Sequence, residues 1–525
     1  MAGVLRSTIK APAGGRTPAG TFLVGGARVD LAPAPKIFGG RTWMREGCTS
    51  IEGGNVDGDH LLPPADDAVD ELRSWPASSP DCVYLGGFGI GPVRPAERVG
   101  PGGVWIRALA ISNGRQTFVY GIADLVGWFA RYDSTICSDC GIRDVRERVA
   151  REVGTSPANI VVASTHSHAT ADTYGGWGGI PDWYRNQIRD STIAAAKQAV
   201  ANLRPATVDA GEVHLRDRNS ERRDTYYSNA DTGATWLQAR ALPPRGCRGA
   251  TCRPVIATLA TYAAHPTIVS SNQLHADWPG ATARRLEQRF GGVGLLFEGG
   301  LGNVSVSAAA AKTDVVSAER TGRAIGDDVV RAIAERGTAL RSNDMRTAVR
   351  DITHPVTTNP GLTTLATVGL FDREFLPATP GAGVPGVYHW SKAGELSSFG
   401  DDSAEPAGEL ARGCTSAGPT LITTVGAHRI GEMLVAFAPG EIFSNISEVI
   451  KERADRSVVT MVMGQANDAL GYIIQSYEYD MQGNFVTEYA TGTGEYEEVF
   501  SVDRCIGDHV LEAMLESTAA LGFGR

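Results

Sequence analysis

The chain has 525 residues, of which 42% are hydrophobic and 21% are charged, and these proportions are typical of a folded protein with material for one large core or two smaller ones. The formal net charge of −10 argues against a nucleic-acid partner, because binding to a phosphate backbone depends on clustered Lys and Arg. No run approaches the ~18 consecutive apolar residues that a membrane-spanning helix needs.

The chain begins with a stretch rich in Gly, Pro and Ala, and this composition predicts a flexible N-terminal arm over residues 1–22. We expect the remainder, residues 23–525, to form a single domain. Two segments within it, near 214–253 and 340–425, are rich in Pro, Gly, Arg and Thr. They are predicted to be long loop insertions or antiparallel hairpins.

Eight cysteines form an even set, and two pairs lie close in sequence, Cys137 with Cys140 and Cys247 with Cys252. The second pair falls in a loop rich in Pro, Gly and Arg, where a short disulfide would order the backbone. A redox or zinc motif at Cys137 and Cys140 is the weaker interpretation, because no second Cys-x-x-Cys follows at zinc-ribbon spacing. The sequence therefore favours disulfides and a secreted or extracytoplasmic location.

The first predicted unit is a helix followed by a strand that ends in two histidines. A valine at every fourth position predicts a helix over 143–153. After a Ser-Pro break, the apolar run 160–165 predicts a buried strand, and His166 and His168 follow it directly.

Four more apolar runs repeat this design, since each ends in polar residues suited to chemistry. These runs are 255–264 before His265, 293–297 before the glycine-rich stretch 298–305, 433–438 before Glu441, and 458–463 before Asn467 and Tyr472. The helices predicted between the runs are 182–203, 279–290, 317–336 and 443–454. Strands that alternate with helices predict an α/β fold, with a mixed sheet covered by helices and a site at the carboxyl ends of the strands.

Two of the ten histidines, His166 and His265, lie at the ends of apolar strands. A catalytic zinc site takes three protein ligands and leaves one position open. Alternate residues of an extended strand point the same way, so His168 faces the same cleft as His166. Taken singly, a core histidine bonded to backbone, a helix-capping role for Glu441 and a buried ring for Tyr472 are the commoner interpretations. Two histidines spaced in this way after a buried strand favour a metal site.

Ser305 lies in the glycine-rich stretch, and three roles are open for it. It can be a nucleophile, a binder of a substrate hydroxyl, or a turn or capping residue. The sequence contains no Gly-x-Ser-x-Gly elbow, no His-Glu-x-x-His helix and no phosphate loop ending in Gly-Lys-Ser/Thr. Serine-triad and metzincin-type enzymes are therefore excluded.

Several motifs resemble those of the neutral, non-lysosomal ceramidases and follow in the same order. The motifs are Thr165-His-Ser-His168 with Tyr174-Gly-Gly-Trp177, Ala264-His-Pro-Thr267, Leu301-Gly-Asn-Val-Ser305, Pro439-Gly-Glu441 and Asn467 to Tyr472. The resemblance runs from about Val24 to the C-terminus and covers the catalytic domain, without the immunoglobulin-like domain that members usually carry after it. It departs at Asn303, where the family has Asp, and at Ala469, where the family has Tyr.

The resemblance implies that zinc is the cofactor and that His166, His265, Glu441 and Tyr472 are its ligands. It further implies cleavage of the amide bond of ceramide or a related N-acyl lipid, by attack of a zinc-bound hydroxide. A lipid substrate implies transient contact with a membrane surface.

The resemblance also implies catalytic roles beside the metal. His168 and Tyr472 would lie by the scissile carbonyl, and Ser305 would bind the substrate hydroxyl or attack the amide. Arg218 lies in a stretch similar to the family's Asn-Arg-Ser motif and would complete the catalytic set. Two alternatives are an amidohydrolase-type barrel enzyme acting on another N-acyl or ester substrate, and an inactive secreted protein that binds lipid or zinc, the latter motivated by Asn303.

Overall fold

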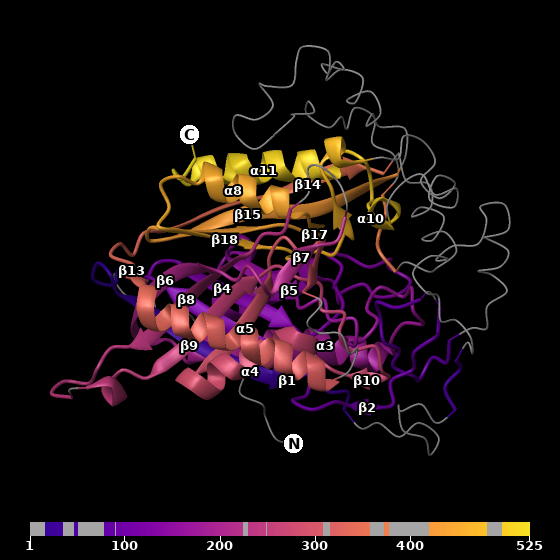
Figure 1. Cartoon of the computed structure of the whole chain (residues 1–525), viewed down its shortest axis with the longest axis horizontal. Helices are drawn as coiled ribbons and strands as arrows, with labels where there is room; N and C mark the ends of the chain where they lie inside the picture. Colours follow the sequence, from indigo (N-terminus) through magenta and orange to yellow (C-terminus); the bar gives the residue numbers. More distant parts are fainter. Residues whose placement is uncertain are drawn as a thin grey trace, which may run out of the picture.

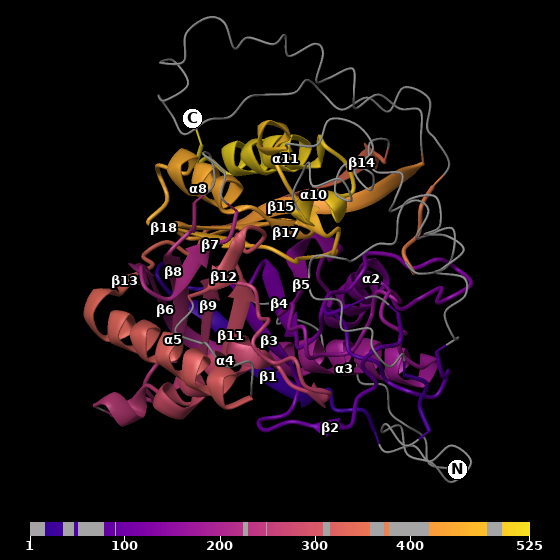
Figure 2. The same cartoon turned by 45° about the vertical axis from the view of Figure 1, so that its right-hand side comes forward.

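The computed structural model describes residues 16–34, 47–50, 78–89, 91–223, 229–247, 249–307, 315–356, 372–376, 419–479 and 496–524. In this part of the chain two β-sheets pack face to face, and helices cover the outer face of each sheet (Figure 1, Figure 2). The layers therefore follow one another as helices, sheet, sheet and helices.

The larger sheet has nine strands. They are β1 (Phe22–Asp30), β3 (Trp105–Ser112), β4 (Thr117–Ala123), β5 (Ile160–Ser164), β6 (Arg204–His214), β8 (Gly233–Ala241), β9 (Val255–Tyr262), β11 (Val293–Glu298) and β13 (Thr338–Ala339). Their order is β11-β9-β8-β6-β1-β3-β4-β5, and β13 pairs with β6. The pairs β4–β5 and β9–β11 are parallel, and the others are antiparallel. Every residue of β4, β5 and β9 is buried, as expected for strands covered on both faces.

Four helices cover the outer face of this sheet. They are α2 (Ile142–Val153), α3 (Asp182–Ala201), α4 (Asp277–Phe290) and α5 (Val315–Arg336). The helices α2 and α3 pack against β1, β3, β4 and β5, whereas α4 and α5 pack against β8, β9 and β11. The valines of α2 at positions 145, 149 and 153 are fully buried, which explains the four-residue spacing seen in the sequence.

The smaller sheet has four strands in the order β14-β15-β16-β18. They are β14 (Met345–Pro355), β15 (Thr420–Ile430), β16 (Met433–Phe437) and β18 (Val459–Met463). β16 and β18 are parallel, and α8 (Ser444–Arg453) forms the crossover between them. α8 and α11 (Ile506–Ala520) cover the outer face, while Phe437 and Met463 face the larger sheet in a core shared with Phe118 and Phe297.

Short ladders and helical turns complete the described structure. They are β2 (Arg98–Val99) with β10 (Gln273–Leu274), β7 (Asn219–Glu221) with β12 (Val304–Val306), β17 (Glu441–Ile442) with β19 (Tyr472–Ile473), the helix α10 (Tyr496–Val499), and the 3-10 turns η1 (Pro157–Asn159), η2 (Ala250–Cys252) and η6 (Ser476–Glu478). The ladders β7–β12 and β17–β19 bring together segments that are far apart in the sequence.

The sequence-based fold prediction is confirmed in its main features. A mixed sheet covered by helices is present, and each of the five predicted helices begins and ends within two residues of its predicted position. The prediction named one sheet, but the runs 433–438 and 458–463 belong to a second sheet. An amidohydrolase-type barrel is not formed by the described residues, because β5 and β11 are the two ends of the larger sheet and no ladder joins them to each other.

The two segments with unusual composition contain regular structure. Segment 214–253 contains β8, which lies inside the larger sheet between the antiparallel strands β6 and β9. Segment 340–425 contains β14 and part of β15, which form a long antiparallel pair. Between these two strands, residues 357–371 and 377–418 lie outside the described residues.

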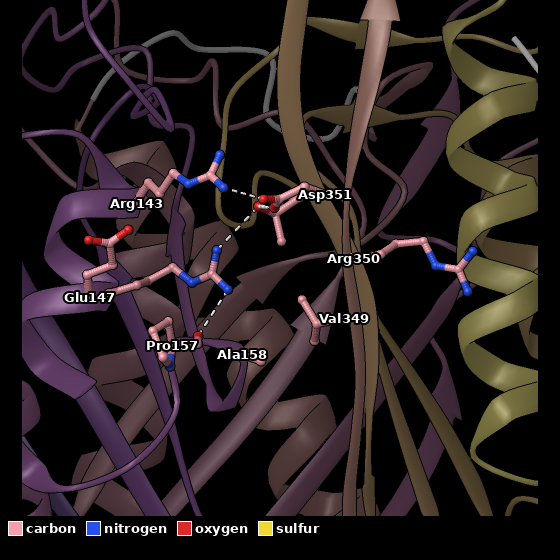
Figure 3. Close-up of a pocket in the computed structure, with 9 residues that line it drawn as sticks. Arg143, Glu147, Pro157, Ala158, Val349, Arg350 and Asp351 are labelled. Carbon is pink, nitrogen blue, oxygen red and sulfur yellow. Dashed lines mark hydrogen bonds and ion pairs between the residues drawn. The ribbon is translucent and has the colours of Figure 1, made fainter. Parts of the chain in front are cut away.

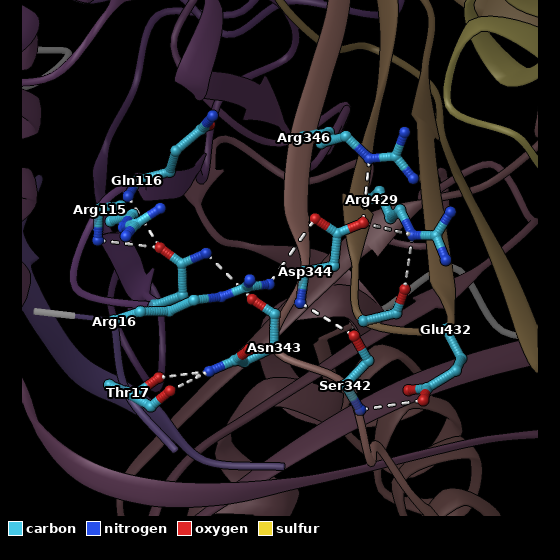
Figure 4. Close-up of polar contacts among 12 residues, drawn as sticks. Arg16, Thr17, Arg115, Gln116, Ser342, Asn343, Asp344, Arg346, Arg429 and Glu432 are labelled. Atoms are coloured by element: carbon cyan, nitrogen blue, oxygen red, sulfur yellow. Dashed lines mark hydrogen bonds and ion pairs between the residues drawn. The ribbon is translucent and has the colours of Figure 1, made fainter. Parts of the chain in front are cut away.

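The described part of the predicted N-terminal arm is anchored where the two sheets meet (Figure 4). The Thr17 amide donates to the Asn113 carbonyl at 2.9 Å, and the Asn343 side chain donates to the Thr17 hydroxyl at 2.9 Å. Beside them, Asp344 pairs with Arg346 at 3.0 Å and with Arg429 at 3.4 Å. Residues 16–21 are thus tied down before β1 begins, and residues 1–15 lie outside the described structure.

A cavity of about 250 Å³ lies where α2 meets the smaller sheet (Figure 3). Its two central arginines already have partners, since Arg143 pairs with Asp351, and Arg146 donates to the carbonyls of Pro157 and Ile160, each at 3.0 Å. Burial lowers the pKa of Arg146 to about 10. These contacts join the two halves of the fold and do not involve the candidate metal centre.

Disulfides join Cys137 to Cys140, Cys247 to Cys252, and Cys48 to Cys82. The two close pairs predicted from the sequence are therefore confirmed. Among the described residues, no helix combines the length and the hydrophobicity that crossing a bilayer requires.

Candidate metal centre

His166 lies just beyond β5, where the chain turns sharply. Its φ of 57° is in the left-handed region, which costs a residue with a side chain on the order of 1–3 kcal/mol and persists only where surrounding contacts impose it. The ring Nδ1 lies 2.6 Å from the Val126 carbonyl oxygen, to which it donates. Because Nδ1 carries the hydrogen, the lone pair of Nε2 is available to a metal.

His265 is held in the same way at the end of β9. Its amide and its Nδ1 both donate to the Val304 carbonyl, at 2.9 Å and 3.0 Å. The side chain is fully buried, and its ring lies edge-on to the ring of His166, with 5.3 Å between the two ring centroids. Each histidine therefore presents Nε2 to the same point.

The curvature of the larger sheet explains how these residues meet. β5 is one edge of the sheet, while β9 lies next to the other edge, β11. β11 nevertheless contacts β3, β4 and β5, so the sheet coils until its edges approach each other. The carboxyl ends of two distant strands are thereby brought to one place.

The smaller sheet's side contributes Glu441 and Tyr472, which are directly paired in the parallel ladder of β17 and β19. Glu441 Oε2 lies 3.0 Å from His265 Nε2 and 3.3 Å from His166 Nε2. The Tyr472 hydroxyl oxygen lies 3.4 Å from His265 Nε2. Residues that are far apart in the sequence thus converge on one point between the layers.

These atoms fit a tetrahedral metal site. Metal–ligand bonds of roughly 2.0–2.1 Å place neighbouring ligand atoms about 3.3 Å apart, close to the spacings observed here. The buried cluster of His166, His168 and His265 can also hold a metal ion, because its ring nitrogens lie within 4.8 Å of one another. Nitrogen and carboxylate donors of this kind suit zinc. Which three or four of the five side chains bind the ion stays a prediction.

The electrostatics of the cluster also suit a cation. Burial, followed by the charge of Arg222, lowers the pKa of His265 to about 4, and burial lowers the pKa of His168 well below its usual value. Burial alone would raise the pKa of Glu441, but His166 and His265 together hold it well below its usual value. At neutral pH the two rings are therefore neutral and the carboxylate is charged, which are the forms that bind metals.

His168 is partly exposed, whereas His166 and His265 are buried. Its Nε2 lies 3.4 Å from His166 Nε2, and its backbone carbonyl accepts a hydrogen bond of 2.7 Å from Arg94. The ring of Phe88 packs edge-on against the ring of His168 at 5.2 Å. A side chain at Gly87, where φ is 95°, would collide with the same ring. The glycine thus allows the loop to approach His168 closely.

Ser305 and Asn303 lie beside His265, and within the described part of the chain Asn303 has side-chain hydrogen bonds, whereas the Ser305 hydroxyl has none. Ser305 is the bridge partner of His265 and is partly buried. The Asn303 amide nitrogen donates to Glu221 and to the Asn229 carbonyl, and its oxygen accepts from the Ser444 amide at 2.8 Å. Asn303 needs both its donor and its acceptor here, and a carboxylate would face Glu221 directly.

Of the arginines near Asn219, the structure brings Arg222 to the cluster. Arg218, the candidate from the sequence, is partly exposed and pairs with Asp328 on α5 at 2.8 Å. Arg222 Nη2 instead donates to the Tyr472 hydroxyl at 2.8 Å. The sequence offers one signal that could have pointed to Arg222 as the arginine at the metal centre. Two adjacent arginines, 222 and 223, have the charge opposite to that of two adjacent glutamates, 497 and 498.

Comparison with known proteins supports the fold but not a sequence family. No family model matches the chain, and no curated protein matches it. Among solved structures, a ceramidase described as complexed with C2 superposes with a TM-score of 0.58 at 13% identity, covering 95% of this chain and 75% of its own. The neutral ceramidase from Pseudomonas aeruginosa gives a TM-score of 0.55 at 15% identity, covering 94% and 75%. The chain therefore has a ceramidase-like fold.

Proposed function

We propose that the protein is a zinc-dependent hydrolase that cleaves the amide bond of ceramide or of a related N-acyl lipid. The observation that carries the proposal is the position of Glu441 Oε2, which lies 3.0 Å and 3.3 Å from the Nε2 atoms of His265 and His166. These residues would hold the ion, and Tyr472 would lie beside it. The ceramidase-like fold supports the choice of substrate.

When bound, a zinc ion lowers the pKa of water to about 7 and polarises a carbonyl oxygen. His168 is neutral at pH 7, because burial lowers its pKa, so its Nε2 can accept a proton from the attacking water and return it to the departing amine. Burial raises the pKa of Tyr472, so its hydroxyl stays protonated and can donate to the developing oxyanion. Ser305, beside His265, can bind a hydroxyl of the substrate.

The aromatic residues near His168 suit the acyl chain of a lipid. Phe88 packs against the His168 ring, and Trp177 lies in the same region, with its ring nitrogen donating to the Gly89 carbonyl. Both offer apolar surface beside the position of the scissile bond. Trp183 lies further along the chain on α3, in contact with the same core as Trp177.

We further propose that the protein works outside the cytoplasm, where it contacts a membrane surface transiently to reach its substrate. Three disulfides support this location, because such bonds persist in oxidising compartments.

The test is acyl release from N-acyl-sphingosine, measured with the purified protein, after removal of metal by a chelator, and after addition of zinc. We expect the chelator to abolish release and zinc to restore it. His166→Ala should be inactive, whereas His214→Ala, which changes an exposed histidine bonded to Thr232, should retain activity. Release that is unaffected by the chelator or by His166→Ala would refute the proposal. A wild type that binds zinc without any release would favour the inactive binding protein.

A further inference from the structure

Two adjacent glutamates of α10 each hold one of two adjacent arginines that follow β7. Glu497 pairs with Arg222 Nε at 2.7 Å, and Glu498 pairs with Arg223 Nη2 at 2.7 Å. Both glutamates are buried, so each needs the opposite charge beside it. Arg223 and Glu498 are 275 positions apart, so the two ion pairs join distant segments of the chain.

The two ion pairs face different parts of the protein. Arg222 Nη2 donates to the Tyr472 hydroxyl at 2.8 Å and to the Gly302 carbonyl at 2.9 Å, so this pair reaches the candidate metal centre. Arg223 instead donates to the Glu478 carbonyl at 3.1 Å and lies over the ring of Phe443. The two ion pairs thus have the same charges and join the same two segments. Of the contacts described here, those of Arg222 reach the metal centre and those of Arg223 do not.

Glu441, a candidate metal ligand, is an alternative partner for the Arg222 guanidinium. Glu441 is the ladder partner of Tyr472 in β17–β19, so the Arg222 guanidinium that donates to Tyr472 is held next to the residue paired with Glu441, whose carboxylate has the opposite charge. A guanidinium that moved onto Glu441 would take up the oxygens that a metal needs. The ion pair between Arg222 and Glu497 opposes this movement.

We propose that Glu497 is a positioning residue for the metal centre. It holds Arg222 on the phenol oxygen of Tyr472 and keeps the guanidinium away from Glu441. The inference rests on the proposed function for its effect on turnover, but its effect on metal affinity does not depend on the substrate.

The experiment compares Glu497→Gln with the matched control Glu498→Gln in the full chain. The measurements are zinc affinity by competition with a chelator, kcat and KM for N-acyl-sphingosine, and the midpoint of thermal unfolding. Loss of a residue that orients a metal ligand typically costs 10–100-fold in affinity or activity. We expect both variants to lower the unfolding midpoint, but only Glu497→Gln to lower zinc affinity by about tenfold and kcat by roughly 10–100-fold with KM nearly unchanged.

A second substitution separates positioning from general damage. Adding Arg222→Met to Glu497→Gln removes the competing guanidinium, so zinc affinity should return to within about threefold of wild type while kcat stays low. If Glu497→Gln does not fold, Arg222→Met is compared with the double variant, and loss of Glu497 should then leave zinc affinity unchanged.

Equal zinc affinity and equal kcat in the two glutamine variants would overturn the inference. So would a further tenfold loss of zinc affinity on removing Glu497 when Arg222 is already absent. A wild type that binds zinc but does not cleave N-acyl-sphingosine would instead overturn the proposed function, and the zinc affinities would still decide the role of Glu497.

Discussion

The two sides of the candidate metal centre are held in different ways. On the side of the larger sheet, the rings of His166 and His265 are fixed by backbone carbonyls. On the other side, Tyr472 is held by the side chain of Arg222, which is in turn held by Glu497. A backbone carbonyl remains after any substitution, whereas a series of side chains can be removed one member at a time. Metal binding and activity should therefore depend on the imidazole side mainly through the histidines themselves, whereas the phenol side should also be sensitive to substitutions further from the metal centre.

Loss of His265 should have the largest effect. His265→Ala removes one ligand and leaves Glu441 without its nearest partner, so we expect loss of bound metal and a fall in kcat/KM of about 1,000-fold or more, because a catalytic metal contributes several kcal/mol. Metal content and acyl release are measured together. Retention of stoichiometric zinc by this variant would contradict the ligand assignment.

On the phenol side, Tyr472→Phe removes a single oxygen and keeps the ring. We expect kcat to fall by roughly 10–100-fold, because Nη2 of Arg222 loses one of its two acceptors and the reaction loses a donor to the oxyanion. Tyr262→Phe is the control, since its hydroxyl donates to the Leu215 carbonyl in the core. If the two variants had equal kcat, Tyr472 would have no direct role in the reaction.

Asn303→Asp sharpens the comparison by placing a charge next to Glu221. We expect a loss of about 3 kcal/mol in the free energy of unfolding at pH 7, because the new carboxylate faces Glu221 and the Asn229 carbonyl in a buried site. Adding Glu221→Gln supplies a donor and should recover most of the loss, as denaturant unfolding can show. A stable, more active single variant would favour the inactive binding protein over the hydrolase.

The contact between Asn303 and Glu221 also predicts that the stability of the protein depends on pH. Burial raises the pKa of Glu221 from 4.5 to about 7, so its protonated form is favoured in the folded state. The stability that this group contributes is present below pH 4.5 and is lost as the pH rises towards and through 7. In Glu221→Gln that part of the decline should disappear, and unfolding at several pH values between 4 and 8 checks it. An unchanged pH profile would mean that Glu221 has an ordinary pKa in the folded protein.

The smallest effect is expected at Arg218. It is 40% exposed and pairs with Asp328, and exposed ion pairs typically contribute about 0–1 kcal/mol. Arg218→Ala should leave kcat within about twofold of wild type, whereas Arg222→Ala should lower kcat by more than this. The opposite order would show that the sequence motif located the functional arginine better than the structure does.

Local patterns predicted five helices, five strands and the histidine side of the site, but of the nine strands in the larger sheet they predicted only β5, β9 and β11. Apolar runs such as 160–165 and 255–264 mark buried strands by themselves, and polar residues that follow such strands gather at one edge of a sheet. His166 and His265 could therefore be paired before any coordinates were known. Glu441 and Tyr472 follow two further apolar runs, and the resemblance to ceramidases assigned them to the same site.

The remaining features depend on contacts between distant segments. An apolar run such as 433–438 shows that a strand is buried but not which sheet it joins, so the second sheet was not foreseen. Arg222 differs from Arg218 only through its contacts with Tyr472 and Glu497, which lie 250 or more positions away. The coiling that brings the edges of the larger sheet together is likewise a property of the whole sheet and of no single strand.

The most direct test of the central claim is a crystal structure of the protein grown with zinc, with anomalous diffraction recorded at the zinc edge. We predict one strong peak, with bonds of roughly 2.0–2.2 Å to Nε2 of His166, Nε2 of His265 and an oxygen of Glu441. A peak that excludes Glu441, or the absence of any peak between these side chains, would contradict the account.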